Sequence, residues 1–225
     1  MKDEVIQRQL ADAIVRGESG LAEAKAKVIA QYAKDPTEAL DDLYDAFRAA
    51  ESLHMMGEYD ENRFDASAHA AQASLNALKS SLIPRQTRFK ARICIGPVSG
   101  GRDVISTIVA AMLTATGHEV TDLSRATTSK ELLRNAEQSN VELLIVSFNE
   151  QTVSLAEEFI SEFESGGFQS KFQVMAFARG SPPNIPVSDR FALVVHEPLE
   201  LLSKVTEFLI RKQRSVQKDE DDSTD

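Results

Sequence analysis

The sequence predicts an α/β protein in two parts: an N-terminal four-helix bundle, then a doubly wound five-stranded parallel sheet. Three observations lead to this prediction. Apolar side chains recur at helical spacing through most of residues 2–84. From residue 90 onward, short apolar runs alternate with longer amphipathic stretches, which is typical of strand–helix–strand units. The change of period falls at residues 84–87, where the sequence PRQT interrupts the helical pattern.

Residues 1–84 are predicted to form the bundle, with Gly17 and Gly20 ending a first short helix. The segment Asp35-Pro36-Thr37-Glu38 reads as a later helix start, with Asp35 as its cap and Pro36 in its first turn. Two apolar stripes at three- and four-residue spacing mark the buried faces of the helices that follow. They are Leu40, Leu43, Phe47, Ala50, Leu53 and His54, then Phe64, Ala68, Ala71, Leu75, Leu78 and Leu82.

After a linker at residues 85–89, residues 90–212 are predicted to form the sheet domain. Strands are expected at 91–95, 119–123, 141–146, 172–177 and 191–195, and helices at 104–115, 129–137, 153–163 and 198–210. Such sheets bind ligands outside the carboxyl ends of the strands, where the strand order reverses. The candidate ligand loops are therefore 96–102, 147–151 and 178–186. Residues 213–225, which end in KDEDDSTD, are predicted to be a disordered acidic tail.

Composition excludes several classes of function. The 225 residues hold 25 Lys and Arg against 35 Asp and Glu, and the resulting net charge of -10 repels nucleic-acid phosphates. No apolar run approaches the roughly 20 residues of a membrane-spanning helix. The single cysteine, Cys94, and the lack of an apolar leader predict a cytoplasmic protein without disulfides. Within the first strand, Cys94 is expected to be a buried, inert thiol.

The loops do not match the common phosphate-binding motifs. The segment Gly96-Pro97-Val98-Ser99-Gly100-Gly101 has the wrong glycine spacing for a dinucleotide site. Arg102 and Asp103 stand where a phosphate loop needs a lysine and a hydroxyl. A receiver domain would place an aspartate and a lysine where this chain has Ser147 and His196. No nucleophile–base constellation is readable, so the sequence gives no argument for intrinsic catalysis.

A bundle followed by such a sheet resembles the corrinoid-binding module of cobalamin-dependent methyltransferases and of cobalamin photoreceptor regulators, over residues 1–212. Residues 56–64, MGEYDENRF, look like the turn between the third and fourth bundle helices of that family. Ser147 matches the serine that lines the family's nucleotide-tail pocket, and 178–180 stand at its paired glycine. The resemblance implies a flavodoxin-like sheet and a cobalamin site formed by Tyr59, His69, Ser99, Gly100, Gly101, Arg102, Asp103, Ser147, Gln151, Arg179 and Gly180.

This sequence departs from the family at the motif Gly-Asp-x-His-x-x-Gly, whose histidine ligates cobalt. Gly101 stands at the place of the motif's aspartate, Asp103 at that of the histidine and Ser106 at that of the last glycine. Either cobalamin binds with its own base on the metal, or the site has drifted to another ligand or to none. From the residues alone, Asp103 also suits the N-terminus of the helix at 104–115, where it is able to pair with Arg102.

Haem is the alternative cofactor, because iron accepts histidine or methionine as axial ligands. His54, next to Met55 and Met56, and His69 are the candidates for that role. The expected function is a non-catalytic cobalamin-binding-type module that serves as sensor, regulator or carrier for an unidentified protein partner, with a homodimer as one candidate assembly. The alternatives are a protein-interaction scaffold with an empty crevice, a haem-binding sensor and the corrinoid subunit of a methyltransferase.

Overall fold

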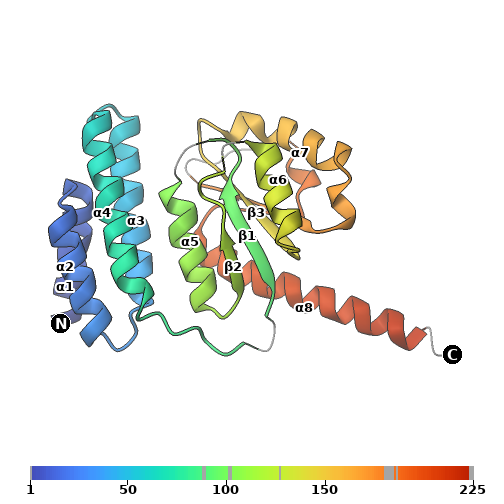
Figure 1. Ribbon diagram of the computed structural model, residues 1–225, viewed down its shortest axis with the longest axis horizontal. Helices are drawn as coiled ribbons and strands as arrows, with labels where there is room; N and C mark the ends of the chain where they lie inside the picture. The colour runs from blue at the N-terminus through green and yellow to red at the C-terminus, as the bar shows by residue number, and fades with distance from the viewer. Residues whose placement is uncertain are drawn as a thin grey trace. The chain divides into compact units, whose positions relative to one another are not determined.

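The computed structural model describes residues 2–87, 90–100, 103–126, 128–179, 185 and 187–222, with the backbone alone at 2–3 and 212–222. The chain divides into two compact units (Figure 1). One comprises residues 1–84 together with 107–115, and the other comprises 85–106 and 116–225. We call them the helical unit and the sheet unit.

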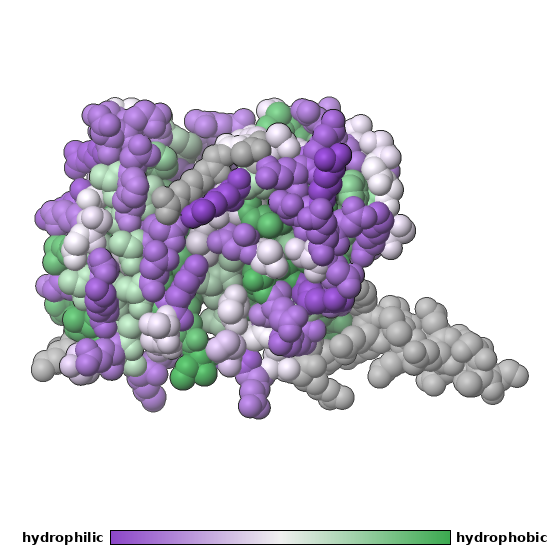
Figure 2. Space-filling model, in the orientation of Figure 1, coloured by the Kyte–Doolittle hydropathy of each residue, from purple (hydrophilic) through white to green (hydrophobic). Residues whose placement is uncertain are grey.

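Four helices make up the N-terminal part of the helical unit: α1 (Lys2–Arg16), α2 (Ser19–Tyr32), α3 (Glu38–Met55) and α4 (Glu61–Lys79). Helix α1 packs against the other three, and α2 and α3 each pack against α4. The predicted stripes supply much of the interior, since Leu40, Leu43, Leu75 and Leu78 are all at most 1% exposed. Mostly hydrophilic side chains cover the visible outer face of these helices (Figure 2). The predicted four-helix bundle is confirmed.

The sheet has five parallel strands in the order β2-β1-β3-β4-β5. They are β1 (Arg92–Pro97), β2 (Glu119–Asp122), β3 (Leu143–Phe148), β4 (Gln173–Ala178) and β5 (Leu193–Val195). The three central strands are almost wholly buried, whereas β2 at the edge is mostly exposed. This is the doubly wound sheet that the alternating pattern predicts, and its order reverses between β1 and β3.

The helices between the strands are α5 (Val104–Ala115), α6 (Ser129–Gln138), α7 (Ala156–Ser165) and α8 (Pro198–Asp222). Apart from Thr114, every residue of α5 is buried, which explains its almost uniformly apolar sequence. One face of the sheet packs with α6 and α7 into a core rich in phenylalanine. Its aromatic members are Phe148, Phe159, Phe163, Phe172 and Phe191.

Most element ends differ from the sequence prediction by a few residues, and Gly20, predicted to help end the first helix, lies inside α2. Two of the differences have a clear physical reason. Helix α3 begins at Glu38 and not at Pro36, because Asp35 and Thr37 first form a tight turn in which the Thr37 amide donates to Asp35 Oδ1 at 3.0 Å. Helix α8 continues to Asp222, so residues 213–222 of the predicted disordered tail carry helical backbone. Half of that segment is Arg, Lys, Gln or Glu, which favour helix, although three of its last four residues are aspartate.

No helix within the described residues is both long enough and apolar enough to cross a membrane.

Candidate functional site

Four polar side chains meet at the carboxyl ends of the central strands, and all belong to the sheet unit. Asp103 directly precedes α5, and Ser106 lies one turn into that helix. Ser147 is the penultimate residue of β3, and Arg179 directly follows β4. Each of the four is at most 8% exposed. We call them the Asp103–Arg179 cluster.

The Arg179 guanidinium joins the cluster. Its Nη1 donates to both carboxylate oxygens of Asp103, at 2.8 and 2.9 Å, and to Ser147 Oγ at 2.8 Å. Ser106 Oγ donates to Asp103 Oδ2 at 2.6 Å. The cluster thus ties the loop after β1 to the ends of β3 and β4.

Backbone bonds hold the cluster's members in position. The Arg179 amide donates to the Phe148 carbonyl at 3.0 Å, which extends the β3–β4 ladder by one residue. The Val98 amide does the same for β1 by donating to the Ser147 carbonyl at 3.2 Å. Asp103 Oδ1 also accepts the Ile105 amide at 3.1 Å and so caps α5, at the helix N-terminus where the sequence places it.

Electrostatics keep Asp103 ionised. Burial alone would raise the pKa of its carboxyl group, but the charge and hydrogen bonds of Arg179, aided by Ser106, hold this pKa below its ordinary value. The negative charge of the buried Asp103 carboxylate is balanced by the positive charge of the buried Arg179 guanidinium, so the net charge of the cluster is zero. Loss of either partner would leave the other charge buried alone.

The remaining predicted site residues are spread over both units. In the first loop, Ser99 is half-buried and Gly100 exposed. Gln151 is exposed, and its backbone amide donates to Asn149 Oδ1 in the turn after β3. Gly101, Arg102 and Gly180 lie outside the described residues.

Tyr59 lies within the helical unit and is 7% exposed. Its hydroxyl donates to the Val15 carbonyl at 2.9 Å, and Arg63 lies 4.2 Å above its ring centroid. Ser67 Oγ donates to the same carbonyl at 3.1 Å. These contacts tie the end of α1 to the α3–α4 turn, so Tyr59 fastens helices together.

The two histidines proposed as haem ligands have local partners. His54 Nδ1 bonds the Tyr59 carbonyl at 2.9 Å, and its ring stacks on Phe64 at a centroid distance of 4.5 Å. His69 is exposed on α4, and its Nδ1 bonds the Asp65 carbonyl at 2.8 Å. The described residues hold no group of three or more His, Cys, Asp or Glu side chains placed to bind a metal ion.

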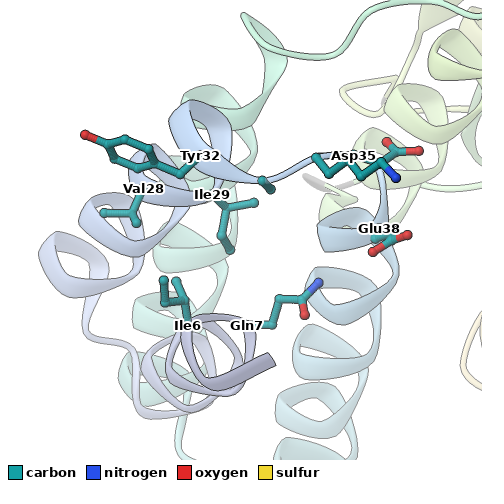
Figure 3. A pocket seen from close by; sticks show the side chains of 9 residues that line it. Ile6, Gln7, Val28, Ile29, Tyr32, Asp35 and Glu38 are labelled. Carbon is teal, nitrogen blue, oxygen red and sulfur yellow. The ribbon is translucent and has the colours of Figure 1, made fainter. Parts of the chain in front are cut away.

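A hollow of about 510 Å³ lies within the helical unit, beside α1, α2 and the start of α3 (Figure 3). Ile6, Val28 and Ile29 form its apolar part, and Tyr32 at its edge is 70% exposed. Among its polar residues, Asp35 is engaged by the Thr37 amide. The hollow thus differs from an enclosed ligand pocket with converging polar groups, and the Asp103–Arg179 cluster remains the candidate site.

The partnership between Asp103 and Arg179 is not predicted by the sequence. The sequence singles out Arg179 only because it stands at a glycine position of the family that the sequence resembles, and it favours the neighbouring Arg102 as the partner of Asp103. The two partners are 76 residues apart. A signal was available, since each follows a central strand, and parallel strands end at the same edge of a sheet.

Comparison with solved structures gives the fold an independent parallel. The chain is similar to the monomethylamine corrinoid protein of Methanosarcina barkeri, with a TM-score of 0.74 and 14% sequence identity over 92% of this chain and 99% of that one. This likeness supports the bundle-plus-sheet fold, and at such identity it extends to the fold alone.

Two further structures are similar at lower TM-scores. A cobalamin-binding protein from Desulfitobacterium hafniense DCB-2 has a TM-score of 0.45 and 19% identity, over 90% of this chain and 98% of that one. The methanol:cobalamin methyltransferase complex MtaBC of Methanosarcina barkeri has a TM-score of 0.44 and 20% identity, over 93% of this chain and 81% of that chain. No protein-family model and no curated protein matches this sequence.

Proposed function

We propose that this chain is a non-catalytic cobalamin-binding-type module that acts as sensor, regulator or carrier for a partner protein and gives no ligand to cobalt. The fold shared with a corrinoid protein supports the general class. The state of Asp103 carries the more specific part of the proposal. This residue stands where the resembling family has its cobalt-binding histidine.

Asp103 is unsuited to that ligand role in two ways. Its carboxylate oxygens already accept hydrogen bonds from Arg179, Ser106 and the Ile105 amide. Turning the carboxylate toward a metal would leave the buried Arg179 without its counter-ion, a change that costs about 3–5 kcal/mol. A hard carboxylate also suits magnesium or calcium better than low-valent cobalt.

The residues present therefore do not fit a corrinoid ligated by a protein side chain from this loop. They are compatible with a cobalamin that keeps its own nucleotide base on the metal. A corrinoid subunit of a methyltransferase is less well supported, because the lower ligand that tunes cobalt during methyl transfer has no counterpart at residue 103. The haem alternative has less support, because the fold is shared with a corrinoid protein.

Gel filtration of the purified protein with hydroxocobalamin tests this proposal. We expect the cobalamin absorbance to elute with the protein, with the spectrum of cobalamin whose own base is bound. Haemin added under the same conditions should elute separately. Elution of all cobalamin in the small-molecule volume would refute the proposal.

A second candidate is a protein-interaction scaffold in which the ligand position is permanently filled. The Asp103–Arg179 cluster favours it, because buried side chains stand at the edge where this fold class holds ligands. Failure of both cofactors to bind, together with elution as a homodimer or reproducible binding to one partner, would favour the scaffold over the cobalamin module.

A further inference from the structure

The Asp103–Arg179 cluster stands at a defined place in the topology. The strand order reverses between β1 and β3, and doubly wound sheets hold their ligands in the crevice outside the carboxyl ends of those strands. Asp103 follows β1 in the chain, and Ser147 belongs to β3. Arg179 comes from β4, and its guanidinium reaches Ser147 on β3 and Asp103 beyond it.

The cluster satisfies its own charges. Asp103 is 7% and Arg179 8% exposed, and the carboxylate neutralises the guanidinium over 2.8 and 2.9 Å. To bind Arg179, the phosphodiester of a ligand would have to displace the Asp103 carboxylate, which is already paired with Arg179 and already removed from water. The Asp103 carboxylate thus takes the place beside Arg179 that an anionic group of a ligand would otherwise take.

We infer that the Arg179 side chain, held in place by Asp103, fills and closes the crevice at the point where the strand order reverses, between β1 and β3. Ser147 is 2% exposed, and its hydroxyl accepts a hydrogen bond from this side chain. For the ligand's identity the inference rests on the proposed function: with Ser147 covered, the nucleotide tail of cobalamin stays outside the sheet and its base remains on cobalt. The closure itself does not depend on that proposal.

Thiol accessibility tests the closure without any ligand. Ser147→Cys places a reporter beside Arg179, and Ser99→Cys places one on the half-buried neighbouring loop. The native Cys94 is silent, because it is fully buried and burial raises the pKa of its thiol to about 11. Methyl methanethiosulfonate, with the labelled site read by mass spectrometry, should modify residue 147 at least about tenfold more slowly than residue 99. Equal rates would overturn the inference.

The Ser147→Cys reporter is then placed in the double variant Asp103→Asn/Arg179→Gly, which removes both buried charges together. We expect the thiol at position 147 to react at least about tenfold faster than it does beside Arg179. Labelling of Cys94 would reveal unfolding, and in that case the comparison of residues 147 and 99 in the native background decides. An unchanged rate at residue 147 in the folded double variant would contradict the closure.

Two corrinoids separate this inference from the proposed function. Hydroxocobalamin carries the nucleotide tail and diaquocobinamide lacks it. The double variant should bind hydroxocobalamin at least about tenfold more tightly than the native protein, with no change for diaquocobinamide. The control variant, Glu164→Gln/Arg190→Gly, removes an exposed ion pair of the same unit and should alter neither affinity.

Each binding result has one meaning. Equal gains for both corrinoids, or a loss for hydroxocobalamin, would overturn the assignment of the closed crevice to the tail. Binding of hydroxocobalamin by the double variant alone would support the closure and refute cobalamin binding by the native chain. If no protein binds either corrinoid, the proposed function fails and the tail assignment fails with it, while the thiol rates still decide the closure.

Discussion

At the scale of single residues, the buried pair of Asp103 and Arg179 decides what the carboxyl edge of the sheet is able to do. Asp103 caps α5, neutralises Arg179 and accepts from Ser106 at once. Because its carboxylate oxygens make all three contacts, Asp103 would have to break at least one of them to bind a metal. The stability of the sheet unit and the chemistry of its edge therefore depend on the same two side chains.

Truncation of Arg179 should reveal the cost of an uncompensated buried charge. We expect Arg179→Ala to lower the free energy of unfolding by about 3–5 kcal/mol, because it leaves the Asp103 carboxyl group buried without its counter-ion. Arg190→Ala breaks a half-exposed ion pair with Glu164 and should cost about 0–1 kcal/mol. Urea unfolding followed by circular dichroism measures both, and equal losses would contradict the role given to burial.

His118 should contribute a pH dependence of stability. It is 5% exposed, and burial lowers the pKa of its imidazole because the charged form loses its water. Below about pH 6.5 the unfolded chain binds a proton at His118 that the folded chain does not bind. The free energy of unfolding therefore decreases as the pH is lowered, by at most about 1.4 kcal/mol per pH unit. His118→Gln should flatten the unfolding free energy between pH 7 and 5. His69→Gln, at an exposed site, is the control, and an unchanged slope in His118→Gln would exclude this contribution.

What the sequence predicts at this scale depends on the distance between partners. The place of Asp103 at the start of a helix depends on neighbours in the chain and was predicted, whereas its capping bond to the Ile105 amide was not. The burial of Cys94 within a central strand was also predicted. The choice of Arg179 as partner depends on which strand follows which in space, and no local pattern contains that order.

At the scale of elements, Gly96 explains one feature of the sequence of β1, the strand that precedes Asp103 in the chain. A Cβ atom added to Gly96 in β1 would lie 2.7 Å from the Leu123 carbonyl oxygen and 2.8 Å from Leu132 Cδ1. Both neighbours are held in place, the first by the backbone and the second by the core. The glycine thus allows α6 and the loop after β2 to approach β1 closely.

Gly96→Ala should therefore destabilise the protein by about 1–3 kcal/mol through overpacking. Gly20→Ala is the matched change, since nothing lies within 4 Å of its added Cβ atom and the residue is in helix α2. It should stabilise the protein by about 0.5–1 kcal/mol, because alanine loses less backbone entropy than glycine in a helix. Thermal unfolding measures both, and shifts of the same sign would contradict the account.

Tyr59 offers a prediction that separates a structural role from a cofactor contact. Tyr59→Phe removes the hydrogen bond to the Val15 carbonyl and should cost about 0.5–1.5 kcal/mol of unfolding free energy. Ser67→Ala removes the second donor to the same carbonyl and should cost a similar amount. Neither change should alter co-elution with hydroxocobalamin. A loss of cobalamin from Tyr59→Phe at unchanged stability would restore Tyr59 as a cofactor contact.

The elements were predictable where hydrophobic period decides them. The four bundle helices and the five strands follow from spacing alone. Their ends were less predictable, because local turns compete at the termini. The Asp35–Thr37 turn delays α3, and α8 continues beyond Ile210, its predicted end, through a segment that includes Arg, Lys and Gln.

At the scale of the whole molecule, the chain joins a helical unit to a parallel sheet in an order shared with a corrinoid protein. Fold similarity of this kind does not transfer a binding site, because function depends on particular residues placed on a fold. In this chain those residues are an ion pair, at the place where the family that the sequence resembles has a metal ligand. The proposed function, a cobalamin that keeps its own base, rests on this ion pair together with the fold.

The electron paramagnetic resonance spectrum of bound cob(II)alamin tests this claim most directly. Protein labelled uniformly with ¹⁵N is loaded with unlabelled cobalamin, so that the nuclear spin identifies the axial nitrogen. Asp103→His/Arg179→Gly, which introduces a histidine and removes the side chain that contacts Ser147, is the positive control for a protein ligand and should give ¹⁵N doublets. We predict ¹⁴N triplets, from the cofactor's own base, for the native chain. Doublets from ¹⁵N in the native chain would show a protein nitrogen on cobalt and contradict the account.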